Sequence, residues 1–264
     1  MLGAIIGDIV GSRFEFNNYR KKNFELFSPK SFFTDDTILT LAIGKALTET
    51  SKDACDKYYE TLRENTLHYV RTVGRKYPDA EYGFRFSNWL YSDFPKPYYS
   101  FGNGAAMRVS AVAWVGNTLE EVKYMSRIVT EITHNHPEGI KGAEATAVAI
   151  FMARYGSTKR MIKTTIEKDY YALDFTIDEI RKPYKFNETC QNTVPQSIQA
   201  FLESSDFEDA IRTAVSVGGD SDTLAAITGS IAEAYYGIPM ILKEKALTYL
   251  DQRLYEMYTE CIKS

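Results

Sequence analysis

Near its C-terminal end the chain reads Ser216-Val217-Gly218-Gly219-Asp220-Ser221-Asp222-Thr223-Leu224-Ala225. The two glycines let the backbone turn and approach a neighbouring segment closely. The small apolar residues from Leu224 to Tyr236 have the composition of a buried helix. Asp220, Asp222 and Thr223 therefore fall at the start of that helix, where in isolation they would be capping residues and nothing more.

A second cluster of the same composition lies near the other end of the chain. It reads Phe32-Phe33-Thr34-Asp35-Asp36-Thr37-Ile38-Leu39, and an apolar helical pattern again follows. Two helix starts of this kind can be brought face to face by folding. Their four carboxylates would then repel one another strongly unless cations lay between them. Because hard oxygen ligands suit Mg²⁺, Mn²⁺ or Ca²⁺, the two clusters predict a metal site.

The overall composition is that of an ordinary globular protein. The chain has 264 residues, of which 44% are hydrophobic and 25% charged, enough for one large domain or two small ones. The formal net charge of −4 gives no electrostatic reason to expect nucleic-acid binding, which usually needs a basic stripe.

Cysteine placement and hydropathy favour a cytoplasmic protein. Cys55, Cys190 and Cys261 are far apart and odd in number, so we expect reduced thiols rather than a zinc site or a disulfide framework. The apolar residues 1–10 are interrupted by Asp8 and soon followed by Arg13, which is unlike a signal peptide. No apolar run approaches the ~20 residues of a membrane span, so we expect no membrane partner.

Glycines recur with a spacing of four in the first residues of the chain. On a helix, Gly3, Gly7 and Gly11 make one smooth face that another helix can approach closely. Asp8 is then a buried acid that needs a partner. Glu15 lies between two phenylalanines, which favours a partly desolvated carboxyl with a raised pKa; a surface acid is the alternative.

Helical periodicity dominates the rest of the chain, and period-two alternation is hard to find. We therefore predict an all-α protein. The expected helices cover residues 34–50, 58–75, 119–133, 139–154, 157–169, 194–202, 207–217 and 224–236, with closing helices in 240–262. Residues 76–100 and 170–195 look irregular, and the first of these segments, rich in aromatic residues and proline, is typical of a binding loop.

Two further motifs carry candidate chemistry. The turn Gly102-Asn103-Gly104 opens a helix and can present backbone N–H groups to phosphate oxygens, although a purely structural turn explains it as well. His134 and His136 flank Asn135 just before Pro137. A zinc site has little support because no third ligand is nearby, so a histidine that hydrogen-bonds a substrate or a carboxylate is favoured.

Five motifs in this order resemble the ADP-ribosylglycohydrolase family, whose members include the dinitrogenase-reductase-activating glycohydrolases. The motifs are Gly7-Asp8 with Gly11 and Glu15, Phe33-Thr34-Asp35-Asp36-Thr37, Gly102-Asn103-Gly104-Ala105-Ala106-Met107-Arg108, Thr133-His134-Asn135-His136-Pro137, and Gly218-Gly219-Asp220-Ser221-Asp222-Thr223. The resemblance implies one domain over residues 1–264, an orthogonal helix bundle, and a site for two Mg²⁺ ions for which Mn²⁺ can substitute.

The resemblance also implies roles for particular residues. The implied metal ligands are Thr34, Asp35, Asp36, Asp220, Asp222 and Thr223. The implied catalytic residues are Glu15, Asp35, Asp36 and Asp222. The implied substrate-binding residues are Phe101, Gly102, Asn103, Gly104, Ala105, Met107 and His136. Glu15 would orient or deprotonate the attacking water, and the turn from Gly102 to Arg108 would hold the pyrophosphate.

The implied activity is hydrolysis of the glycosidic bond between ADP-ribose and an acceptor. The stretch Gly11-Ser12-Arg13-Phe14-Glu15-Phe16 resembles the arginine-processing branch of the family, so the resemblance favours an arginine N-linked acceptor, with serine-linked or small-molecule conjugates as alternatives. A non-catalytic ADP-ribose-binding protein is a further alternative, against which the full Thr/Asp ligand set argues. The expected partners are an ADP-ribosylated protein or small molecule and the ADP-ribose product, bound by a monomer.

Overall fold

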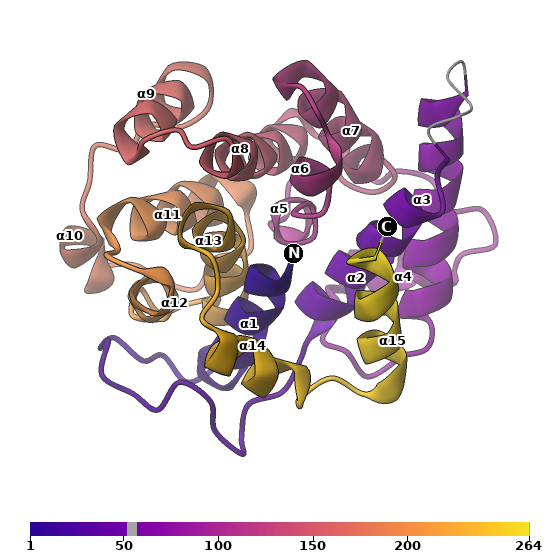
Figure 1. Cartoon of the computed structure of the whole chain (residues 1–264). Coiled ribbons are helices and arrows are strands. Elements are labelled where there is room, and N and C mark those ends of the chain that lie inside the picture. The colour runs from indigo at the N-terminus through magenta and orange to yellow at the C-terminus, as the bar shows by residue number, and fades with distance from the viewer. Residues whose placement is uncertain (52–56, 264) are drawn as a thin grey trace.

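A computed structural model describes residues 1–51 and 57–263 of the chain (Figure 1). Within these ranges the protein is helical and contains no strand, which confirms the all-α prediction. The helices are α1 (Leu2–Gly11), η1 (Ser12–Phe14), α2 (Asp35–Thr48), α3 (Tyr58–Gly74), α4 (Phe84–Tyr91), α5 (Gly104–Met107), α6 (Val112–Val115), α7 (Leu119–Glu131), α8 (Pro137–Arg154), α9 (Lys159–Asp169), α10 (Ile177–Arg181), α11 (Cys190–Glu203), α12 (Phe207–Val215), α13 (Ser221–Tyr236), α14 (Met240–Leu247) and α15 (Gln252–Cys261).

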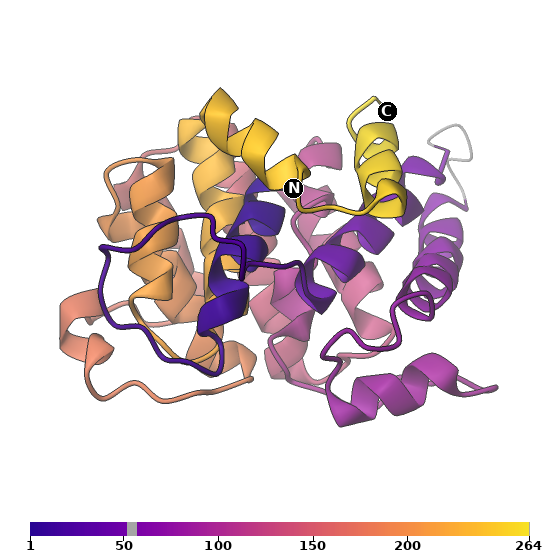
Figure 2. The ribbon, with the colours of Figure 1, turned by 90° about the horizontal axis from the view of Figure 1, so that it is seen from below.

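The first helix, α1, is buried along its whole length and packs against α13, as both ribbon views show (Figures 1 and 2). Its three glycines form the contact. A Cβ atom added at Gly7 would lie 2.0 Å from the carbonyl oxygen of Ala225, and one at Gly3 would lie 2.1 Å from that of Gly229. Gly11 likewise meets the first residues of α13. The predicted smooth face therefore exists, and it brings the ends of two site-bearing segments together.

Asp8 links α1 to the start of α2. Its carboxylate accepts hydrogen bonds from the backbone N–H groups of Thr34 and Thr37, both at 3.0 Å. It also accepts from the hydroxyl of Thr34 at 2.7 Å and from that of Thr37. Burial raises the pKa of Asp8 to about 6, although these four hydrogen bonds act in the opposite direction. The buried acid thus has the partners that its position requires, and it fixes where α2 begins.

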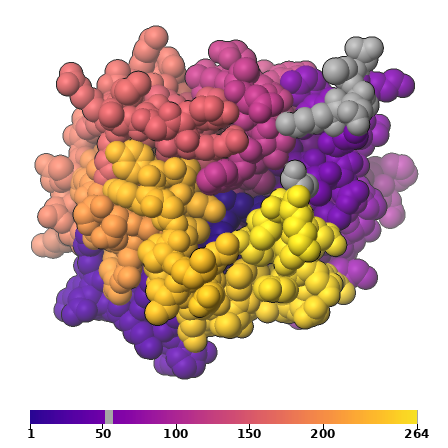
Figure 3. All heavy atoms as spheres, in the orientation of Figure 1, coloured from indigo at the N-terminus to yellow at the C-terminus, as the bar shows by residue number. Residues whose placement is uncertain are grey.

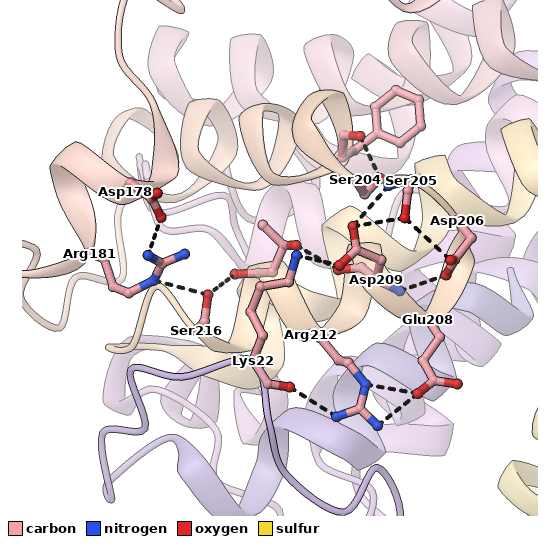
Figure 4. Close-up of polar contacts among 12 residues, drawn as sticks. Lys22, Asp178, Arg181, Ser204, Ser205, Asp206, Glu208, Asp209, Arg212 and Ser216 are labelled. Carbon is pink, nitrogen blue, oxygen red and sulfur yellow. Dashed lines mark hydrogen bonds and ion pairs between the residues drawn. The ribbon is translucent and has the colours of Figure 1, made fainter.

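Side chains from α12 hold the long loop between η1 and α2 in place (Figure 4). Arg212 donates to the carbonyl oxygens of Lys22 at 3.0 Å and Phe24 at 2.5 Å, while Glu208 accepts from its Nε at 2.8 Å. Arg20, which lies in the loop, donates to the carbonyl oxygen of Val217, directly before the glycines that precede α13, at 2.8 Å. The loop that carries Glu15 at its start is therefore tied to the segment that leads into α13.

Two segments predicted to be irregular contain helices. In α4 the buried residues Phe86, Trp89 and Leu90 have helical spacing, which the surrounding aromatic residues and prolines obscured. In 170–195, α10 begins with a capping box formed by Thr176 and Glu179, a sequence signal that was available. The following helix α11 begins at Cys190 rather than at residue 194 and accommodates Pro195 in its interior.

Apart from the cavity that holds the predicted site residues, which is described below, the molecule has a second cavity. It is visible as a hollow between the yellow C-terminal helices and magenta α6 and α7 (Figure 3). This cavity of about 700 Å³ contains none of the predicted site residues. It is lined by residues that include Met1, Trp114, Arg154, Tyr258 and Ile262.

Two of the three cysteines lie within the described residues. Cys190 is buried and Cys261 is half-buried, and neither is in a disulfide among the described residues, whereas Cys55 lies outside the described residues. Among the described helices, none has both the length and the apolar character required to cross a membrane.

Candidate active site

Carboxylates from three segments converge in one cavity. Glu15 follows η1, while Asp220 and Asp222 lie at the start of α13, and one oxygen from each of these three side chains lies within 4.8 Å of the others. Asp35 and Asp36, from the first turn of α2, line the same cavity. The two Thr/Asp clusters are therefore face to face, as their shared composition predicted.

Neutral polar groups hold these carboxylates in position. Thr223 Oγ1 donates to Asp36 Oδ2 at 3.0 Å and so connects α13 to α2. Asn103 Nδ2 donates to Asp220 Oδ2 at 2.6 Å. The other oxygen of Asp36, Oδ1, is buried and has no hydrogen-bond partner among the described residues. A buried carboxylate oxygen without a donor is unfavourable unless a cation satisfies it.

The electrostatics of the cluster lead to the same conclusion. Burial, followed by the charges of Asp220, Glu81 and Asp35, raises the pKa of Glu15 to about 8. Burial and then Asp8 and Asp220 raise the pKa of Asp35 to about 8. The pKa values of Asp36 and Asp222 are also raised well above the ordinary range by burial and neighbouring carboxylates. Oxygen-rich, mutually repelling acids of this kind form a chemically suitable site for hard divalent cations.

The cavity, about 280 Å³ in volume, extends from the carboxylates to the glycine turn before α5. Gly102, Asn103, Gly104 and Met107 line it, as predicted for the substrate-binding turn. Two backbone amides of this turn already donate within the protein. The amide of Gly102 donates to Ser100 Oγ at 3.2 Å, and the amide of Asn103 donates to the Glu188 carbonyl oxygen at 2.7 Å. Fewer amides therefore face the cavity than a phosphate-binding turn could offer.

Four of the predicted site residues do not line this cavity. Thr34 caps α2 and uses its hydroxyl to accept from the Asp36 amide at 3.2 Å and to donate to Asp8. Ala105 is buried beneath the turn. His136 caps α8, accepts from the Glu138 amide at 3.0 Å, and packs its ring 5.1 Å from that of Phe101. Phe101 is 39% exposed and is not among the residues that line the cavity.

Arg108, the last residue of the turn expected to hold the pyrophosphate, lines the cavity, and so do Glu81, His134 and Glu188, which were not predicted as site residues. The sequence did contain a signal that favoured His134 over His136. Pro137 is typical of the first residue of a helix, so His136 directly before it is expected to cap that helix, and His134 is left as the histidine available to the site. His136 is accordingly used as a cap, and His134 is the histidine that turns inward and is buried. Glu81 and Glu188 lie in the two segments predicted to be irregular, where no periodic pattern indicated their direction.

Comparison with known proteins agrees with this architecture. The family model described as ADP-ribosylglycohydrolase matches residues 1–261. The chain is 23% identical to the ADP-ribosylhydrolase ARH3 of Mus musculus, over 91% of this chain and 84% of that protein. It is 26% identical to the ADP-ribosyl-[dinitrogen reductase] glycohydrolase of Rhodospirillum rubrum, over 90% of this chain and 84% of that protein. A solved structure titled ADP-ribosylglycohydrolase-related protein complex superimposes with a TM-score of 0.69 at 20% identity, covering 99% of this chain and 95% of that one.

The fold is all-α, and two Thr/Asp clusters at the starts of α2 and α13 meet in one cavity. The match over almost the whole chain shows that this protein belongs to the ADP-ribosylglycohydrolase family. That membership indicates an ADP-ribosyl glycohydrolase.

Proposed function

We propose that this protein is a Mg²⁺-dependent hydrolase that cleaves the glycosidic bond between ADP-ribose and an arginine side chain. The observation that carries the metal dependence is the convergence of four aspartates in one cavity, three of them buried and one of these with an oxygen that has no donor among the described residues. Magnesium prefers such oxygen ligands, and Mn²⁺ would substitute for it. The residues that would hold two such ions are Thr34, Asp35, Asp36, Asp220, Asp222 and Thr223.

Bound in this cluster, divalent cations would supply positive charge that holds ribose hydroxyls and makes a nearby water more acidic. Glu15 would orient that water and accept its proton, since its carboxyl lies within the cluster and bound cations would offset the neighbouring negative charges that hold it protonated without metal. The acids lining the cavity that the cations leave unbalanced would add negative charge, which favours an oxocarbenium-like transition state. The acceptor nitrogen would then leave with a proton, and ADP-ribose would be released.

The substrate would lie in the cavity in one direction. The pyrophosphate would lie at the turn lined by Gly102, Asn103 and Gly104, with the distal ribose at the aspartates. Phe101 and His136, whose rings contact each other outside the cavity, would extend this groove for the rest of the ADP moiety. The acceptor would therefore leave on the side of Glu15.

The surroundings of Glu15 support a cationic acceptor. Two divalent cations would balance the charges of the four aspartates, which leaves Glu15, Glu81 and Glu188 as acids lining the cavity. Close in the sequence to Glu15 and Glu188, the exposed rings of Phe16 and Phe186 stack with their centroids 5.9 Å apart. A guanidinium is attracted by carboxylates and stacks on aromatic faces, whereas a serine hydroxyl gains from neither.

The experiment that tests this function offers the protein a panel of ADP-ribose conjugates. We expect release of ADP-ribose from arginine-linked conjugates in the presence of Mg²⁺, at a rate at least tenfold above that from serine-linked or small-molecule conjugates. Faster release from serine-linked or small-molecule conjugates would replace the proposed acceptor and keep the hydrolase. Tight ADP-ribose binding without release from any conjugate would make the protein a binding module.

A further inference from the structure

Arg108 is the largest side chain that is almost completely buried in the described part of the protein, with 1% of its surface exposed. It follows α5 and lines the substrate cavity. Its Nη2 donates to Thr133 Oγ1 at 2.6 Å and lies 3.3 Å from His134 Nδ1. Its Nε and Nη1 have no hydrogen-bond partner among the described residues. A buried guanidinium that is only partly satisfied is unfavourable for folding, so packing alone is a poor reason for its presence.

The contacts of Arg108 determine which nitrogen of His134 carries the proton. A guanidinium can donate hydrogen bonds but cannot accept them. His134 Nδ1 lies 2.7 Å from Thr133 Oγ1, and Arg108 Nη2 points at both atoms. The arrangement that satisfies all three has Arg108 donating to the hydroxyl and the hydroxyl donating to Nδ1. A proton on Nδ1 would instead face the guanidinium N–H, so the proton of the neutral ring belongs on Nε2.

The Nε2 atom faces the glycine turn. It lies 3.3 Å from the position that a Cβ atom would occupy at Gly104 and 3.5 Å from the corresponding position at Gly102. The two glycines therefore leave open the space in front of the imidazole N–H. Burial, followed by the charges of Arg108 and Arg85, holds the pKa of His134 well below its ordinary value. The ring is then a neutral donor, flanked by two fixed positive charges.

We propose that Arg108 is a positioning residue that, through Thr133, fixes His134 as the Nε2–H tautomer and so aims one hydrogen-bond donor at an anionic oxygen held by the Gly102–Gly104 turn. The anion is a pyrophosphate oxygen of the ADP-ribosyl group, and this assignment rests on the proposed function. The arrangement also explains how a turn whose amides are partly used within the protein can bind a pyrophosphate. The positive charge of Arg108 strengthens the site without direct contact, because the surroundings are buried and of low dielectric.

The first test reads the tautomer directly in the metal-free protein. The chain has three histidines, so a long-range proton–nitrogen correlation spectrum of the ¹⁵N-labelled protein is simple, and the signals lost in His134→Gln assign the ring. We expect His134 to be neutral with its proton on Nε2 at pH 7, and to lose this preference in Arg108→Met. A proton on Nδ1, or an imidazolium at pH 7, would overturn the proposal even if no variant folds.

The second test separates positioning from packing by ligand binding. Calorimetry on metal-free protein compares ADP, which carries the pyrophosphate, with adenosine, which lacks it. We expect Arg108→Met to weaken ADP binding at least tenfold and to leave adenosine binding unchanged. His134→Gln, which keeps a side-chain N–H donor, should recover part of the ADP affinity that His134→Leu loses. The control is Arg154→Met in the second cavity, since Arg154 is a partly buried arginine whose guanidinium donates to backbone carbonyl oxygens and does not line the substrate cavity.

Equal weakening of ADP and adenosine by Arg108→Met would show a structural role only and would overturn the proposal. Wild-type ADP affinity in a folded Arg108→Met protein would do the same. Neither measurement needs hydrolysis. Failure of the proposed enzymatic activity therefore leaves both results interpretable, and failure of the positioning role leaves the activity intact.

Discussion

Gly7→Ala tests whether the close approach of α1 and α13 builds the site. An added Cβ would lie 2.0 Å from the carbonyl oxygen of Ala225 and 2.5 Å from the amide nitrogen of Ala226, whereas ordinary contacts begin near 3.4 Å. The two helices must therefore separate by more than 1 Å. Overpacking of a core costs about 1–3 kcal/mol, and contact with rigid backbone places this case at the upper end. Higher helix propensity returns up to about 1 kcal/mol.

The net expected loss is about 2–3 kcal/mol of unfolding free energy, which corresponds to a melting temperature lower by about 4–12 °C. Thermal unfolding followed by circular dichroism measures it, and Mg²⁺ should stabilise the variant less than the wild type because Glu15 and Asp222 no longer meet correctly. Gly83→Ala is the control, since its added Cβ meets nothing within 4 Å and should cost no more than about 1 kcal/mol. If Gly7→Ala melts within a degree of the wild type, the glycine face does not set the helix separation.

Three further predictions concern the carboxylates. Asp36→Asn should abolish Mg²⁺-dependent hydrolysis while the helical spectrum survives; retained turnover at saturating Mg²⁺ would remove Asp36 from the ligand set. Glu15→Gln should keep ADP-ribose affinity and lower kcat by about 10²–10⁴-fold, and near wild-type turnover would show that Glu15 does not handle the proton. Without metal, burial and neighbouring carboxylates raise the pKa of Asp35 to about 8 in the folded protein. Between the ordinary aspartate pKa and this raised value, the folded state keeps a proton that the unfolded state has lost. The free energy of unfolding should therefore fall as pH rises from about 5 to 8. Urea unfolding at several pH values measures this slope, which saturating Mg²⁺ should flatten, and a metal-free protein that gains stability over that range would contradict it.

Patterns within the sequence predicted much of the fold because they depend on local chemistry. Glycines four apart predicted the face by which α1 meets α13, and a lone acid in that apolar helix predicted a buried partner for Asp8. The two Thr/Asp clusters were recognisable because each directly precedes an apolar helical run. Their convergence followed from shared composition together with the family resemblance, since no local pattern encodes a contact between residues 36 and 223.

The remaining details depend on tertiary packing that no local pattern contains. Glu188 reaches the cavity from a segment without periodicity, and Glu81 does so from another. His134 was passed over for His136, although Pro137 marks His136 as a cap. The roles of Phe101 and Ala105 in substrate binding stay predictions, because the structure has Phe101 outside the cavity and Ala105 below its surface.

The central claim is that the buried aspartates hold divalent cations that are required for cleavage of an ADP-ribosyl bond. The most direct measurement is release of ADP-ribose from an arginine-linked conjugate while Mg²⁺ is titrated into protein stripped of metal. We predict no release without metal and a saturable increase with Mg²⁺ that is absent in Asp36→Asn. Full activity of the stripped protein in excess chelator would contradict the claim.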